Sequence, residues 1–116
     1  MIVRITRGRV RPNCEAAAFE VVRRISSDAR RPDGLEHMHI GRRLVGDRNE
    51  LLAVSVWRDI AALEAALGAT YAKPGFVKEL DPYVEDLSVQ LYETVVDQFE
   101  GLRDLAIGPD GRAALA

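Results

Sequence analysis

Residues 34–68 constrain the fold of this 116-residue chain more than any other stretch. They read GLEHMHIGRRLVGDRNELLAVSVWRDIAALEAALG. Residues 35–44 and 50–57 are strand candidates, and the Gly, Asp and Asn residues between them fit a hairpin loop. Asp59 is placed to cap an alanine- and leucine-rich helix that Gly68 ends. The stretch therefore predicts strand, turn, strand and helix.

The flanking segments complete a regular order of elements. Residues 1–10 are rich in β-branched side chains and predict a strand. Phe19, Val22 and Ile25 recur at helical spacing and predict an amphipathic helix over residues 14–29, with Asn13 as its N-cap. A last strand is expected from 84 to about 96. The order is that of a ferredoxin-like α+β fold, a four-stranded antiparallel sheet with both helices on one face.

The length fits one folded domain, which we place at residues 1–96. Residues 97–116 form a tail of different character. Phe99, Leu102 and Leu105 predict a helix over residues 96–107, and the final GPDGRAALA reads as a loose end. We therefore expect a C-terminal helical or flexible tail.

Charge and cysteine content exclude several classes of protein. The 16 basic and 18 acidic residues are interspersed, without the basic stripe that nucleic acid requires. Cys14 is the only cysteine, so no intramolecular disulfide or cysteine-ligated metal cluster can form. The arginines in MIVRITRGRV leave no uninterrupted apolar segment for a signal peptide or membrane span. We expect a soluble, cytoplasmic protein that binds neither nucleic acid nor membrane.

Alternation along the strands divides the expected sheet into two faces. If neighbouring strands align like with like, one face is almost purely aliphatic, with Met38, Ile40, Leu52, Val54, Val56, Leu87, Val89 and Leu91. The other face is mixed, and we leave open whether Arg4 and Thr6 join it. It carries His37, His39, Ser55, Trp57, Gln90 and Tyr92.

Two helices cover only one face of such a sheet, so the other face must be polar or meet a partner. An aliphatic patch of this size is rarely left exposed on a monomer. We therefore expect a homodimer formed through the aliphatic face, with the mixed face beneath the helices. Polar groups in that position need partners or a cavity with water or ligand, which predicts a small-molecule pocket there.

The element order, the sequence Ser55-Val56-Trp57-Arg58-Asp59 and the closing strand DLSVQLYE at residues 86–93 resemble the dimeric α/β-barrel superfamily. Within it the chain most resembles antibiotic-biosynthesis-monooxygenase-like domains, over residues 1 to about 96. The resemblance implies a homodimeric α/β barrel with a pocket between sheet and helices in each subunit. Ala53 departs from relatives that carry a polar amide on this face. The haem-degrading branch needs a histidine on the second helix, and this chain has none after His39.

His37 and His39 are spaced to point the same way on a strand, as two metal ligands would. A zinc or non-haem iron centre needs a further protein ligand, and the sequence has no third histidine, so we expect no metal. The alternative is that both imidazoles are hydrogen-bonded residues of a pocket wall. His39 is the candidate general base, because histidine titrates near neutral pH.

The remaining candidates would contact a substrate. Trp57 and Phe19 are candidate apolar walls, although Trp57 has core packing as its alternative. Tyr92 and Gln90 are candidates to orient a substrate oxygen through hydrogen bonds. His37 and Ser55 complete the set. No phosphate-binding glycine loop or nucleotide fingerprint is present, so no cofactor is expected.

The resemblance implies a cofactor-independent monooxygenase-like enzyme acting on a small aromatic or polyketide-like substrate, whose carbanion reduces oxygen directly. Two alternatives stay open. One is a non-catalytic small-molecule-binding or stress-associated homodimeric module that uses the same pocket. The other is a dimerisation domain whose pocket is filled by its own side chains.

Overall fold

The computed structural model describes residues 1–28, 30–95, 106–107 and 113–114. The main elements follow as β1 (Ile2–Val10), α1 (Glu15–Asp28), β2 (Leu35–Arg42), β3 (Glu50–Trp57), α2 (Ile60–Leu67) and β4 (Val84–Glu93). Two short 3₁₀ helices, η1 (Gly68–Thr70) and η2 (Lys78–Tyr83), lie between α2 and β4. The predicted ferredoxin-like α+β order is therefore confirmed.

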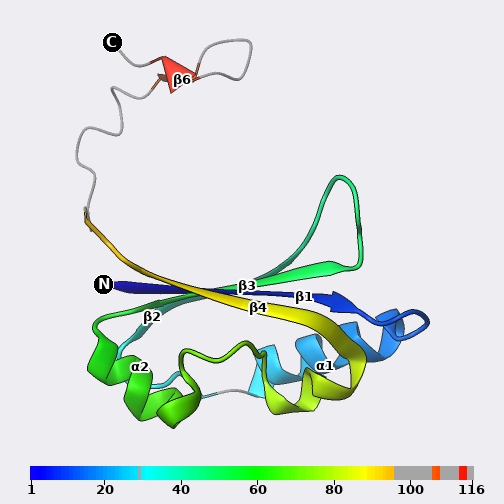
Figure 1. Cartoon of the computed structure of the whole chain (residues 1–116), viewed down its shortest axis with the longest axis horizontal. Coiled ribbons are helices and arrows are strands. Elements are labelled where there is room, and N and C mark those ends of the chain that lie inside the picture. The colour runs from blue at the N-terminus through cyan, green and yellow to red at the C-terminus, as the bar shows by residue number, and fades with distance from the viewer. Residues whose placement is uncertain (29, 96–105, 108–112, 115–116) are drawn as a thin grey trace.

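The sheet runs in the order β2-β3-β1-β4, with antiparallel pairing between all neighbours. Both α1 and α2 lie on the same face of this sheet (Figure 1). In the tail, β5 (Ala106–Ile107) pairs with β6 (Ala113–Ala114). The helix predicted over residues 96–107 is wrong at 106–107, which form β5, and its remaining residues lie outside the described ones. The domain boundary near residue 96 stays a prediction.

Both ends of α2 follow local sequence signals, whereas the start of α1 departs from them. Asp59 has extended backbone, and its Oδ1 accepts a hydrogen bond from the Ala62 amide at 2.8 Å, as an N-cap does. Gly68 ends α2 with φ 64°. Asn13 was expected to cap α1, but it has left-handed backbone with φ 65°, so it forms the turn before the helix instead of an extended N-cap.

Strand β3 separates the two faces of the sheet as predicted. Its side chains alternate between buried and partly exposed positions along the whole strand. Leu51, Ala53, Ser55 and Trp57 are buried on the face that carries the helices. Leu52, Val54 and Val56 point to the opposite face, which we call the open face.

The predicted alignment of the other strands with β3 was wrong. Cross-strand pairing places Met38 opposite Ser55 and Ile40 opposite Ala53, so both face the helices. His37 and His39 instead pair with Val56 and Val54 on the open face. On β4 the reversal is the same. Leu91 and Val89 pair with Arg4 and Thr6 beneath the helices, whereas Tyr92 and Gln90 pair with Val3 and Ile5 on the open face.

A register irregularity explains why alternation alone failed for β2. The pairing with β3 shifts between Leu35 and His37, where two residues of β2 pass against one of β3. Because side chains alternate with a period of two, one added residue moves all later side chains to the other face. Leu35 and Met38 therefore share the helix-covered face.

The core beneath the helices consists of two clusters. One lies under α1 and contains Val10, Ala18, Val21, Leu51, Leu80 and Val84. The second contains Trp57, Ala62 and Leu63 and anchors α2. Each helix thus buries its own end of the sheet. The part of the sheet between the two clusters is left without a packed helix core above it.

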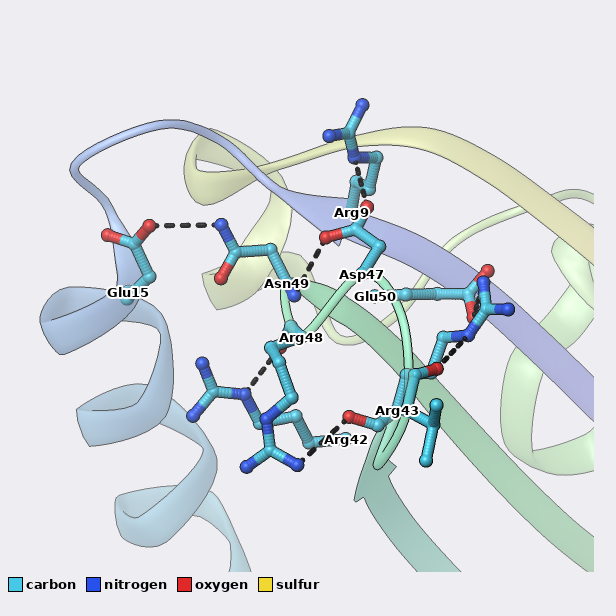
Figure 2. Close-up of polar contacts among 9 residues, drawn as sticks. Arg9, Glu15, Arg42, Arg43, Asp47, Arg48, Asn49 and Glu50 are labelled. Atoms are coloured by element: carbon cyan, nitrogen blue, oxygen red, sulfur yellow. Dashed lines mark hydrogen bonds and ion pairs between the residues drawn. The ribbon is translucent and has the colours of Figure 1, made fainter.

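The loop between β2 and β3 is fixed by charged and amide side chains (Figure 2). Arg9 Nε pairs with Asp47 Oδ2 at 2.7 Å, and Asn49 Nδ2 donates to Glu15 Oε1 at 3.1 Å. These contacts tie the loop to β1 and to the first turn of α1. Leu44 and Val45 are 79% exposed at its tip.

In the part of the chain that the structure describes, no helix combines the length and the apolar character that crossing a membrane requires.

Candidate functional site

A cavity of about 720 Å³ lies between the sheet and the two helices. Its sheet wall includes Arg4, Met38, Ile40, Ala53, Ser55 and Trp57. The opposite wall combines α1, α2, η2 and the connection to η2, with Val22, Ile25, Ser26, Ala66, Leu67, Gly75, Phe76, Val77 and Leu80. The volume suits a molecule of drug-like size. A domain whose pocket is filled by its own side chains would show no such cavity, so that alternative is not supported.

Trp57 and Ser55 form a buried polar pair on the sheet wall. The Trp57 Nε1–H donates to Ser55 Oγ at 2.9 Å, and the two residues are only 4% and 7% exposed. Both were predicted to lie beneath the helices, and both do. Because Ser55 Oγ accepts from the indole, its own hydroxyl hydrogen is available to a further acceptor. The pair thus offers an aromatic surface beside one hydroxyl donor.

Arg4 enters the cavity wall from β1, beside Ser55. The two residues are cross-strand partners on β1 and β3, so their side chains leave the sheet on the same side. Arg4 Nη1 donates to Thr6 Oγ1 at 2.8 Å, and Thr6 is fully buried. Burial lowers the pKa of Arg4 from its ordinary value, because desolvation disfavours the charged form.

The segment 71–77 closes the cavity on the side of the connection to η2. Arg4 holds this segment through the main-chain oxygens of Tyr71, Lys73 and Gly75. Phe76 packs over Gly8, where an added Cβ would lie 2.6 Å from Phe76 Cε2. The missing side chain at Gly8 therefore makes room for the ring that lines the cavity.

The two histidines do not join Trp57 and Ser55. Edge-strand residues 35–40, His37 and His39 among them, line one side of the cavity, but register turns both imidazoles toward the open face. The rings stack nearly parallel, with centroids 6.5 Å apart. Across the described residues, no cluster of three or more His, Cys, Asp or Glu side chains is placed to hold a metal.

Three other predicted contacts lie away from the cavity. Tyr92 Oη donates to Gln90 Oε1 at 3.3 Å, and both side chains are exposed on the open face. Phe19 packs against the α1 core cluster, with the Arg42 guanidinium 4.8 Å from its ring centroid. These residues are therefore separated from the Trp57–Ser55 pair, and their role in substrate binding stays a prediction.

Several residues of the cavity were not among the sequence candidates. Met38, Phe76 and Arg31 line it, and so does Arg4, which the sequence does not assign to either face of the sheet. An arginine between Val3 and Ile5 on an apolar strand is the one local signal that was available for Arg4. Phe76 and Arg31 come from connections between elements, where the sequence carries no periodicity to place them.

No protein-family model matches the sequence, and no curated protein does. Solved structures do match. A candidate antibiotic biosynthesis monooxygenase from Deinococcus radiodurans is 18% identical with a TM-score of 0.67, over 85% of this chain and 97% of that one. Its counterpart from Nitrosomonas europaea is 16% identical with a TM-score of 0.64, over 83% and 100%.

SnoaB, a cofactor-independent oxygenase from Streptomyces nogalater, is 22% identical with a TM-score of 0.61, over 80% of this chain and 91% of its own. At such identities the comparisons show the fold. The chain has the fold of the antibiotic-biosynthesis-monooxygenase-like structures, as the resemblance in the sequence predicted.

Proposed function

We propose that this chain, folded like the antibiotic biosynthesis monooxygenases, binds a small, flat aromatic molecule in the cavity between its sheet and its helices. The observation that carries the proposal is the buried Trp57–Ser55 pair on the wall of the 720 Å³ cavity. An indole face packs well against another ring, and an adjacent hydroxyl can fix a ligand oxygen.

We further propose that the bound molecule is oxidised without a cofactor. In such a reaction the deprotonated substrate carries the electrons and reduces oxygen directly. The support is the shared fold with SnoaB, a cofactor-independent oxygenase. Among the described residues that line the cavity, no base faces Trp57 and Ser55, since register turns the imidazole of His39 away from them.

That placement also favours a second candidate function, non-catalytic binding of the same class of molecule. Within the described lining of the cavity, the acid–base side chains other than arginine are His37, His39 and Glu36, all on edge strand β2. A binding module needs no proton transfer and makes the same use of Trp57 and Ser55. Turnover therefore separates the two functions.

Oxygen uptake with 1,4-naphthohydroquinone tests the enzyme. We expect the protein to accelerate uptake above auto-oxidation, and Ser55→Ala to lower kcat/KM about twofold to tenfold, as for loss of one neutral hydrogen bond. His39→Ala is the matched comparison, and its turnover should be retained because the imidazole lies on the other face. Uptake no faster than auto-oxidation would favour the binding module. Turnover lost in His39→Ala would restore His39 as the base.

We also propose a homodimer formed through the open face. Its centre carries Val3, Ile5, Val54 and Val56 on the two middle strands, with Leu52 beside the exposed Arg7 at one end. Its edges carry His37, His39, Ser88, Gln90 and Tyr92. An apolar centre with a polar rim is the usual anatomy of a protein interface, and contiguous aliphatic patches are rarely exposed on monomers.

Sedimentation velocity tests this assembly. The wild-type chain should sediment as a dimer, and Val54→Asp should sediment as a folded monomer because it places a charge at the apolar centre. Ala17→Asp adds the same charge to the exposed face of α1 and should leave the dimer intact. A wild-type chain that stays monomeric at micromolar concentration would refute the proposal.

A further inference from the structure

We infer that the cavity takes an aromatic ligand that bears an anionic oxygen, a carboxylate or a phenolate, and that Arg4 receives this oxygen. The inference rests on the proposed function of the cavity as a binding site. It adds the charge of the ligand and the residue that selects it.

Arg4 is a cation with only neutral partners. Nε donates to the Tyr71 carbonyl oxygen at 2.9 Å and Nη1 to Thr6 Oγ1 at 2.8 Å. Nη2 donates to the carbonyl oxygens of Lys73 and Gly75 at 3.0 and 3.3 Å. A guanidinium group has five N–H bonds, and these contacts account for four of them. One Nη1 hydrogen thus has no acceptor among the described residues.

The charge of Arg4 is left uncompensated by these contacts. In the described part of the chain no carboxylate pairs with it, and its pKa is lowered by desolvation alone. Carbonyl oxygens orient the group, but they supply no opposite charge to offset the desolvation that comes with its partial burial. An anionic ligand oxygen at Nη1 would supply that opposite charge, and charge-assisted hydrogen bonds of this kind are the strong ones.

The rim of the cavity has the same sign. Arg30 and Arg31 line it just before the start of β2, and Arg31 donates to the main-chain oxygens of Leu35 and Glu36. Among the described lining residues, Glu36 is the one carboxylate against the cations of Arg4, Arg30 and Arg31. The whole chain carries a formal charge of −2, so the cations at this site oppose the overall charge. Such a site raises the local concentration of anions.

The position of Ser55 makes the site more specific than a basic patch. Ser55 is the cross-strand partner of Arg4, so its hydroxyl and the free Nη1–H lie on the same side of the sheet. One anionic oxygen can accept from both groups while the attached ring packs beside Trp57. The ligand is therefore recognised by an anionic head and a flat apolar body.

Isothermal titration calorimetry with 2-naphthoate and 2-naphthamide tests the inference on the wild-type protein. The two probes share a ring system and nearly the same size but differ in charge. We expect naphthoate to bind about tenfold to a hundredfold more tightly than the amide, the range for a hydrogen bond to a charged group. The preference should shrink at high salt, because ions screen the rim charges.

Arg4→Gln should reduce the preference for naphthoate to near unity, and Arg4→Lys should retain part of it because the charge remains. Arg24→Gln removes an exposed arginine of α1 outside the cavity and should keep the full preference. Because Arg4 also holds segment 71–77, thermal unfolding of each variant checks that the variant is still folded. The comparison of the two probes on the wild-type protein does not depend on any variant being folded.

The outcomes are distinct. Equal affinity for the two probes would overturn the anion inference while leaving the proposed binding function in place. Binding of neither probe, with a folded protein, would contradict the proposed function and the inference together. A preference for naphthoate that persists in Arg4→Gln would overturn the assignment to Arg4.

Discussion

Trp57→Ala is expected to lower the free energy of unfolding by about 3–5 kcal/mol, the usual cost of truncating a buried tryptophan. The side chain is 4% exposed and forms a core cluster with Ala62 and Leu63. Truncation removes the main contact between β3 and α2 and leaves Ser55 Oγ without the indole donor. Urea denaturation followed by circular dichroism measures the loss, since the variant has no tryptophan to report by fluorescence.

Trp57→Phe is the matched variant. It keeps an aromatic ring in the cluster but removes the N–H group that donates to Ser55. We expect it to lose much less stability than Trp57→Ala and to retain binding of aromatic probes. If Trp57→Ala costs under about 1 kcal/mol, less than a typical core truncation, the α2 cluster does not hold that end of the sheet as described.

Gly34→Ala is expected to cost about 2–4 kcal/mol, from left-handed backbone strain and an overlap with a fixed neighbour. Gly34 has φ 83°, a conformation that residues with a Cβ rarely adopt. An added Cβ would lie 2.4 Å from the Ala62 Cβ, which the helix backbone holds in place. The substitution therefore pushes α2 away from the start of β2.

Gly41→Ala is the control for Gly34→Ala. Gly41 lies on edge strand β2, which Gly34 directly precedes, and nothing would contact the added Cβ of Gly41 within 4 Å. Its substitution should change the free energy of unfolding by no more than about 0.5 kcal/mol. Equal effects of the two substitutions in the same denaturation experiment would contradict the account of Gly34.

The sequence was sufficient for the order of elements and for the division of β3 into two faces. Alternation within one strand is a local property, so Ser55 and Trp57 could be placed beneath the helices. The cap at Asp59 and the stop at Gly68 are also local, and both were predicted correctly.

The register between neighbouring strands could not be predicted from the sequence. The assumption that polar positions align with polar positions grouped His39 with Trp57, whereas one irregular residue near Leu35 puts them on opposite faces. No composition rule marks that irregularity. The candidate site changed accordingly, from a histidine-centred pocket to one centred on Trp57, Ser55 and Arg4.

The arginine side chains that bond main-chain carbonyls have a consequence for amide hydrogen exchange in solution. Arg4, Arg42, Arg43 and Arg48 all donate to main-chain carbonyl oxygens of connecting segments. A guanidinium group donates hydrogens and accepts none, so these contacts satisfy carbonyls and add no protection to any amide hydrogen. Where an amide hydrogen of such a segment has no other acceptor, its exchange would then be fast although the path of the segment is fixed. Rapid exchange at such a position would report that the amide hydrogen is unbonded, and would not measure how far the loop moves.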